Sequence, residues 1–195
     1  MNTAAWNERY ANQEYAYGEE PNEFFKEQLD QINQGSILLP ADGEGRNGVY
    51  AASQGWQTTA FDLSEEGKKK ALSLAEKHQT SMDYKLGDFH EMNFQSESFD
   101  VLALIYAHFP AELRSQYHQE LGELVKPGGH VILEGFSKSN LERSKANPSI
   151  GGPKNEEMLF SIKEIKEDFV GFDFLILEER LVDLLEGKYH RGTAS

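Results

Sequence analysis

Short apolar runs alternate along this chain with longer segments in which apolar residues recur at helical spacing. Each run is short and apolar enough to form a buried strand, and the segments between the runs suit amphipathic helices. Alternation of this kind predicts an α/β fold built on a doubly wound parallel sheet. The five predicted strands are Ser36–Leu39, Gln57–Phe61, Met82–Leu86, Phe99–Tyr106 and His130–Phe136.

Capping and stop signals mark the helices between these strands. Ser64 has the side chain of an N-cap, and Lys126-Pro127-Gly128-Gly129 is a clear stop before the fifth strand. Two more helices are predicted before the first strand, where Pro21 suits a first helical turn. The predicted helices are Thr3–Asn12, Pro21–Ile32, Arg46–Gln54, Ser64–Gln79 and Pro110–Val125.

The chain is less regular after the fifth strand. Residues 137–158 are polar and contain two prolines and two glycines, so we interpret them as an active-site flap. A capping box that begins at Ser161 opens a short helix to Phe169. Alternating apolar residues then predict a strand from Phe172 to about Val182.

Length and composition narrow the class of protein. A chain of 195 residues fits one domain with a sizeable core. The chain has no cysteine, which excludes disulfides and thiolate metal sites and makes a reducing cytoplasm the expected location. No apolar run is long enough to cross a bilayer. The net charge of −14 argues against nucleic acid and anionic membranes as partners.

A glycine-rich turn after the first strand is the strongest functional signal. Gly43, Gly45 and Gly48 let the backbone approach a ligand closely, and the helix that follows offers free N–H groups. Asp62, at the C-terminal end of the second strand, could accept hydrogen bonds from two ribose hydroxyls. Together they predict a nucleotide-like cofactor; a tight turn without a ligand is the alternative reading of the glycines alone.

These segments resemble the class I S-adenosylmethionine-dependent methyltransferases, and within them the small bacterial branch that is similar to tellurite-resistance and thiopurine methyltransferases. The resemblance covers nearly the whole chain. It rests on residues 41–47, 61–64, 87–89, 99–106 and 124–129. It implies a Rossmann-like methyltransferase fold with a mostly parallel sheet, helices on both faces and S-adenosyl-L-methionine as cofactor. The single domain, 1–195, would comprise a helical N-terminal cap (1–34), a cofactor-binding core (35–136) and the flap with the C-terminal strand region (137–195).

The resemblance also implies roles for particular residues. Gly43 and Gly45 would pack against the methionine part of the cofactor, Asp62 would bind the ribose, and Asp88 would accept from the adenine amino group. The implied cofactor-binding set is Ala41, Asp42, Gly43, Glu44, Gly45, Asn47, Asp62, Leu63, Gly87, Asp88, Phe89 and Tyr106.

Two departures from the family pattern lead to further expectations. Leu39 and Ala41 stand where the family has an acidic residue and a glycine, so Asp42 or Glu44 would bind the methionine amine instead. The family ends in an antiparallel pair of strands, whereas this chain stops at Ser195, where the last strand should begin. The sheet is therefore expected to be one strand short or completed from elsewhere.

Three residues are candidates for the chemistry itself. Methyl transfer from a sulfonium is an in-line displacement that depends mainly on alignment and water exclusion. Tyr106 and His108 follow the fourth strand, at the edge where such sheets bind ligands. Tyr106 is expected to shape the pocket, and His108 is either a base or a neutral structural histidine. His190 resembles part of a tail motif that reaches the substrate.

The N-terminal aromatic residues have two readings that can both hold. Trp6, Arg9, Tyr10 and Tyr17 resemble the branch's cap over the active site, and they also suit a helix packed against the sheet. Arg9 would pair with an acidic substrate group or with a surface carboxylate.

Rival functions and open points remain. A nicotinamide-dependent oxidoreductase would explain the glycine turn and Asp62, but the chain has no Tyr-x-x-x-Lys pair. A non-catalytic cofactor-binding or regulatory module is the other rival. No metal site is predicted, because the histidines form no H-E-x-x-H motif. The expected partner is a small-molecule methyl acceptor, either a thiol or chalcogen nucleophile or an oxygen or nitrogen one, and the protein is expected to be a monomer or homodimer.

Overall fold

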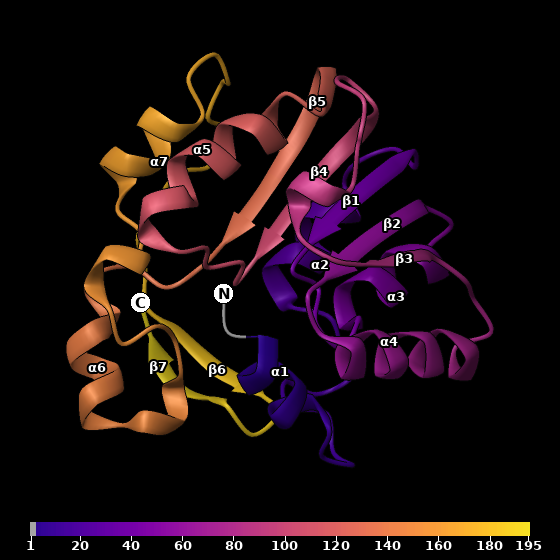
Figure 1. The fold of residues 1–195 in the computed structure, drawn as a ribbon. Helices are drawn as coiled ribbons and strands as arrows, with labels where there is room; N and C mark the ends of the chain where they lie inside the picture. The colour runs from indigo at the N-terminus through magenta and orange to yellow at the C-terminus, as the bar shows by residue number, and fades with distance from the viewer. Residues whose placement is uncertain (1–2) are drawn as a thin grey trace.

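The computed structural model describes residues 3–195 and has a five-stranded sheet between two layers of helices (Figure 1). Its strands are β1 (Ser36–Pro40), β2 (Gln57–Asp62), β3 (Asp83–Leu86), β4 (Phe99–Ile105) and β5 (Val125–Glu134). All four strand pairings are parallel, and the strand order is β3-β2-β1-β4-β5. This order confirms the doubly wound fold. It places the switch point between β1 and β4, where such sheets bind ligands.

Helices cover both faces of the sheet because the buried side chains of each strand alternate between two clusters. Leu38 of β1 packs with α5 (Ala111–Gly122) and α7 (Ile162–Asp168), whereas its neighbours Ile37 and Leu39 pack with α2 (Glu23–Leu29) and α3 (Arg46–Ser53). The second face also carries α4 (Glu65–Lys77). Strands buried on both faces explain the continuous apolar runs in the sequence.

Several helices and strands begin or end at other residues than predicted. The first helix, α1, is Thr3–Tyr10, and α2 begins at Glu23 because the Asn22 side chain accepts from the Phe25 N–H as an N-cap. Helix α5 ends at Gly122, and the stop sequence that starts at Lys126 lies inside β5, where the register against β4 shifts. Such an irregularity accommodates proline and glycine within a strand.

Residues 137–158 are not an irregular flap. They contain α6 (Asn140–Ala146) and the 3-10 turns η2 (Pro148–Ile150) and η3 (Glu156–Met158). Ile150 is buried in a small separate core with Phe136, Leu159 and Leu184. The segment therefore has a packed structure of its own, which its polar composition concealed.

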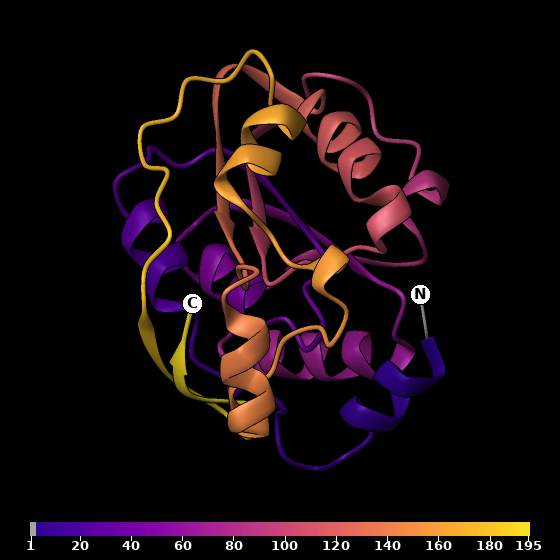
Figure 2. The ribbon, with the colours of Figure 1, turned by 90° about the vertical axis from the view of Figure 1, so that its left-hand side faces the viewer.

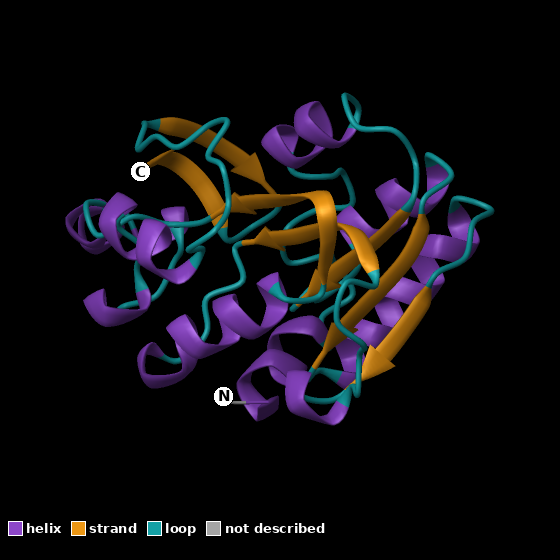
Figure 3. Ribbon diagram, turned by 90° about the horizontal axis from the view of Figure 1, so that it is seen from above, coloured by secondary structure: helices purple, strands orange, loops and turns teal. Residues whose placement is uncertain are grey.

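The predicted strand from Phe172 to Val182 was also wrong. Residues 172–181 are irregular, and the chain then forms an antiparallel hairpin of β6 (Val182–Glu186) and β7 (His190–Ala194), separate from the central sheet (Figure 3). The C-terminal antiparallel pair thus exists, but it does not extend the main sheet. Among residues 3–195, no helix is long and apolar enough to span a bilayer.

Candidate functional site

A cavity of about 640 Å³ lies at the C-terminal edge of the sheet, beside the switch point. Its walls come from the strand ends, from the N-terminal segment and from the C-terminal hairpin. Thirteen of the fourteen predicted site residues line it, namely Ala41, Asp42, Gly43, Glu44, Asn47, Asp62, Leu63, Gly87, Asp88, Phe89, Tyr106, His108 and His190. The exception is Gly45.

The glycines of the turn serve two different purposes. A side chain on Gly43, whose φ is +55°, would collide with the Tyr10 hydroxyl at the cavity wall. A side chain on Gly45, whose φ is +85°, would collide with Ala71 of α4, so this glycine permits close helix packing and does not face the cavity. Gly45 does not line the cavity, and its contact with a cofactor stays a prediction.

Asp62 and Asp88 keep acceptor capacity toward the cavity. The Asp62 carboxylate accepts from the N–H of Gly43 at 3.1 Å and of Ser64 at 2.8 Å. The Leu63 N–H also bonds to this carboxylate, and because a carboxylate has about four acceptor positions, capacity remains for a ribose hydroxyl. Asp88 is the N-cap of the 3-10 turn η1 (Phe89–Glu91), and its Oδ1 accepts from the Tyr117 hydroxyl at 2.7 Å and from the His90 N–H at 3.3 Å, whereas no side chain of residues 3–195 bonds to Oδ2. These acceptors fit the ribose and the exocyclic amine of a nucleoside.

Asp42 and Glu44 differ in how their charges are compensated. Glu44 accepts from Lys70 Nζ and from the Ala16 N–H, both at 2.7 Å, so its charge is already paired. Asp42 has no ion-pair partner among the described residues and accepts from the Gly48 N–H at 3.2 Å. Burial raises the pKa of Asp42 well above its usual range. Of the two carboxylates, Asp42 is the one that a ligand ammonium would stabilise.

Two non-glycine residues beside the switch point have left-handed backbones. Ala41 follows β1 with φ 54°, and Tyr106 follows β4 with φ 53°. Such conformations cost about 1–3 kcal/mol each and cluster at functional sites. Tyr106 is held by its hydroxyl, which donates to Glu134 Oε1 at 2.7 Å, and burial raises its pKa, so it stays protonated. Tyr106 therefore shapes the wall and does not accept protons.

An ion pair between Arg46 and Glu186 joins the start of α3 to the C-terminal hairpin. Arg46, the first residue of α3, bonds through Nη2 to Glu186 at 2.9 Å and through Nη1 to the carbonyl of Tyr17. Glu186 also accepts from His190 Nδ1 at 2.9 Å. Burial alone would raise the pKa of Glu186, but His190 and Arg46 outweigh it and lower that pKa to about 2.

His190 is buried but faces the cavity. Its ring lies 4.5 Å from the rings of both Tyr17 and Tyr106. Burial lowers its pKa, so the ring is neutral at physiological pH, with Nδ1 donating to Glu186. Nε2 is then a hydrogen-bond acceptor on a ring that lines the cavity.

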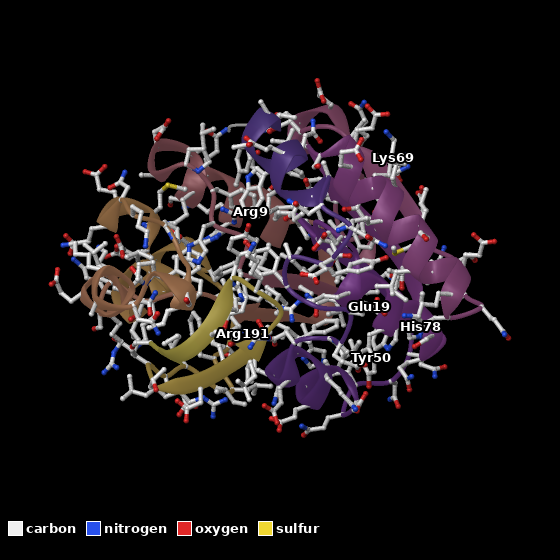
Figure 4. All side chains as sticks on the ribbon, turned by 90° about the horizontal axis from the view of Figure 1, so that it is seen from below. Arg9, Glu19, Tyr50, Lys69, His78 and Arg191 are labelled. Carbon is white, nitrogen blue, oxygen red and sulfur yellow. The ribbon has the colours of Figure 1, made fainter. Side chains whose placement is uncertain are left out.

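Arg9 completes the cover of the cavity. Its guanidinium lies 4.8 Å from the Trp6 ring and 4.7 Å from the Tyr189 ring, and Nη1 donates to the Tyr17 hydroxyl at 2.7 Å. Arg9 belongs to α1, and Figure 4 shows it on the side of this helix that faces the β6–β7 hairpin, which carries Arg191. Arg9 has no carboxylate partner among the described residues, so the surface-carboxylate reading is wrong. We call residues 6–20 and 186–190 the terminal cover.

His108 has both ring nitrogens engaged by backbone. Nδ1 donates to the Met158 carbonyl at 2.9 Å, and Nε2 accepts from the Phe136 N–H at 3.1 Å. The ring is stacked between Phe136 and Phe160. This arrangement leaves no free lone pair for a substrate proton and favours the structural reading of His108.

The same contacts predict acid sensitivity. Burial lowers the pKa of His108 from 6.5 to about 4, so its neutral form stabilises the fold above pH 6.5. This stabilisation, about 3 kcal/mol, is lost as pH falls from 6.5 to 4. In urea unfolding, the free energy of unfolding of His108→Gln should fall less between pH 6.5 and pH 4 than that of the wild type. The control His78→Gln, at an exposed position after α4 (Figure 4), should show the same fall as the wild type. An equal fall in all three proteins would mean that His108 does not cause the acid sensitivity.

Sequence reasoning missed part of the site. Tyr117 of α5, Gly152, Pro153, Asn155 and Met158 line the cavity although they lie far from the motifs. Tyr117 has no local signal, because only the fold brings it to Asp88. The glycine and proline content of residues 151–153 did mark a segment near the site, but not which side chains face inward.

Comparison with known proteins relates this chain to methyltransferases. Residues 37–129 match the methyltransferase domain family. Thiopurine S-methyltransferase of Vibrio atlanticus is 24% identical over 173 residues, which cover 82% of this chain and 75% of that protein. The match therefore extends well beyond the central sheet.

Two solved structures share the fold. TehB from Haemophilus influenzae has a TM-score of 0.68 at 18% identity, over 100% of this chain and 65% of that one. A structure described under the conversion of a disulfide bond into a thioacetal group in echinomycin biosynthesis has a TM-score of 0.69 at 17% identity, over 87% of this chain and 78% of that one. These two structures show the fold alone. The match of residues 37–129 to the methyltransferase domain family, together with the doubly wound sheet, shows that the chain contains a class I S-adenosylmethionine-dependent methyltransferase domain.

Proposed function

We propose that this methyltransferase transfers the methyl group of S-adenosylmethionine to a small molecule, and that the acceptor atom is a thiol or another chalcogen nucleophile. The similarity to thiopurine S-methyltransferase over 82% of the chain supports an acceptor of this class. The observation that carries the proposal is the covered cavity, whose lining combines aromatic rings with two neutral histidines, His108 and His190.

The residues have distinct proposed roles. Asp62 would bind the ribose and Asp88 the adenine amine, with Leu63 and Phe89 beside the ring and Gly43, Asn47 and Gly87 as backbone walls. Asp42 would face the methionine ammonium. The bound cofactor supplies an electrophilic methyl group on a sulfonium, and the protein contributes alignment and exclusion of water.

His190 is our proposed general base. Glu186 fixes its Nδ1–H, which leaves Nε2 to accept the proton of a neutral thiol. A base is needed only for an acceptor that is protonated at the working pH, so a chalcogen oxyanion would not require it. Tyr106 would shape the cavity wall beside this base, and His108 would hold the loop at Met158 through its hydrogen bond to the Met158 carbonyl.

The cover favours a small acceptor over a macromolecule. Trp6, Arg9 and Tyr17 close the outer side of the cavity, and the charge of −14 opposes nucleic acid. We further propose that the protein acts in the cytoplasm without a membrane partner. Arg9, as an unpaired cation at the cavity, would favour an acceptor that carries a negative group.

Turnover with a defined acceptor panel tests the proposal. With S-adenosylmethionine, aromatic thiols and selenite or tellurite should be methylated, whereas phenols and anilines of the same shape should react at least tenfold more slowly. His190→Asn keeps a donor near Glu186 but removes Nε2, so turnover of a neutral thiol should fall by about 10²-fold. Faster turnover of phenols or anilines than of thiols would overturn the proposed acceptor class. Turnover of a neutral thiol by His190→Asn at the wild-type rate would show that His190 is not the base.

A further inference from the structure

The side chain of Tyr117 brings a hydroxyl from α5 to the predicted nucleoside site. Helix α5 lies beside α7 on one face of the sheet (Figure 2), and the Tyr117 hydroxyl donates to Asp88 Oδ1 at 2.7 Å. The tyrosine is buried, and its ring centre lies 5.6 Å from that of Phe89, 4.9 Å from that of His90 and 5.1 Å from that of Phe109, edge-on to each. A ring packed on several sides has little freedom, so the hydroxyl has a fixed place.

A second bond fastens the turn that follows Asp88 to the same helix. His90 of η1 bonds through Nε2 to Glu120 of α5 at 2.7 Å, and Glu120 also accepts from Gln116. Burial and the neighbouring Asp88 carboxylate raise the pKa of Tyr117, so its hydroxyl keeps its proton and is a donor toward that carboxylate. Helix α5 therefore holds both the turn and the carboxylate that caps it.

The two carboxylate oxygens of Asp88 have different surroundings. Oδ1 accepts from the Tyr117 hydroxyl and from the His90 N–H, whereas no side chain of residues 3–195 bonds to Oδ2. The bonds to Oδ1 fix the plane of the carboxylate and leave Oδ2 for a ligand. An oxygen that carries no proton attracts an amine and repels a carbonyl oxygen.

We propose that Tyr117 is a positioning residue, which holds Asp88 so that the site selects a purine with an amine at C6 over a purine with a carbonyl there. The inference rests on the proposed role of Asp88 beside the adenine amine, and it adds the residue that makes this role selective. Oδ2 would accept from the adenine amine, but it has nothing to donate to O6 of hypoxanthine. The carboxylate cannot turn away from O6 without losing its bond to Tyr117. A site whose polar group is left unpaired by the wrong ligand discriminates strongly.

Calorimetric titration with two nucleosides tests the proposal. The probes are S-adenosylhomocysteine and S-inosylhomocysteine, which differ only at C6 of the purine. The wild type should bind the adenosyl compound about a hundredfold more tightly. Tyr117→Phe keeps the packed ring but frees the carboxylate, so this ratio should fall by about tenfold. Tyr50→Phe removes a hydroxyl that donates to Asp30 away from the cavity, and it should keep the wild-type ratio.

Asp88→Asn should invert the preference. The amide oxygen would take the place of Oδ1, where the Tyr117 hydroxyl and the His90 N–H donate, so the NH₂ group would take the place of Oδ2 and face the base. This variant should bind the inosyl compound about tenfold more tightly than the adenosyl one. When Asp88→Asn is combined with Tyr117→Phe, the amide is free to turn over, and the two affinities should agree within about threefold.

Each outcome bears on a separate claim. A wild-type ratio in Tyr117→Phe, or an inverted preference that survives in the double variant, would overturn the role of Tyr117. Asp88→Asn alone provides a test even if Tyr117→Phe does not fold, because an unchanged preference for the adenosyl compound would show that Oδ1 is not held. Equal binding of both compounds by the wild type would reject the role of Asp88 and this inference together. Methylation of phenols or anilines in place of thiols would reject only the proposed acceptor class, because the binding ratio does not depend on the acceptor.

Discussion

Asp62→Asn should weaken binding of S-adenosylmethionine by about tenfold to a hundredfold, which corresponds to about 1.5–3 kcal/mol. The Gly43 and Ser64 N–H groups donate to different oxygens of Asp62, so the amide keeps only one of these acceptors and loses the negative charge and half of the acceptor positions. The ribose hydroxyls would then compete with the turn for one oxygen. Calorimetric titration with the demethylated product measures this loss without turnover.

A matched control separates the effect of losing the Asp62 carboxylate at the site from the effect of changing the net charge of the protein. Asp83→Asn removes a carboxylate at the start of the neighbouring strand, where the side chain is exposed and pairs with Lys85. Its affinity for the cofactor should equal that of the wild type. If Asp62→Asn binds as tightly as this control, Asp62 does not hold the ribose.

Glu186→Gln should lower the free energy of unfolding by about 3–5 kcal/mol, because it leaves the buried guanidinium of Arg46 without its counter-charge. The pKa of Glu186 lies near 2, below its ordinary value of 4.5. Its charge therefore stabilises the wild type fully above pH 4.5, and this contribution is lost as pH falls toward 2. Urea unfolding at pH 7 measures the effect of the substitution.

The pair can be removed without leaving a buried charge. Arg46→Met with Glu186→Leu should recover most of the stability, because both charges are gone, yet turnover should stay low, because His190 Nδ1 has no acceptor. Glu178→Gln, in an exposed pair with Arg180, should change stability by less than 1 kcal/mol. A single Glu186→Gln variant as stable as this control would mean that the ion pair does not hold the terminal cover.

Local signals were sufficient for the core of the fold. The apolar runs of β1, β2 and β4, the Ser64 cap and the glycine turn each depend on neighbouring residues, and the structure has them where the pattern indicated. The predicted strand after Phe172 failed for a different reason. Its composition is typical of a strand, but strand formation also depends on pairing, and among residues 3–195 the segment 173–181 makes no backbone hydrogen bond to a neighbouring strand.

The site was predictable only where it is built on strand ends. Asp62 and Asp88 follow strands, so a parallel sheet brings them to one edge. Sequence cannot tell why a glycine is needed at Gly45: in the structure its missing side chain makes room for Ala71 of α4. The engagement of both His108 nitrogens depends on Met158 and Phe136, far away in sequence, and no local pattern marks it.

The terminal cover ties the last part of the chain to the first. Asn22 and Glu186 are hydrogen-bonded across 164 positions, and Arg46 and Glu186 across 140. During synthesis the sheet and Asp62 can form while the hairpin residues are still inside the ribosome, so a nascent chain has a nucleoside site before it has a closed cavity. Closure of so long a loop is also slow. A nascent chain without residues 186–190 thus has the strand ends that line the cavity but lacks the part of the terminal cover that these residues supply.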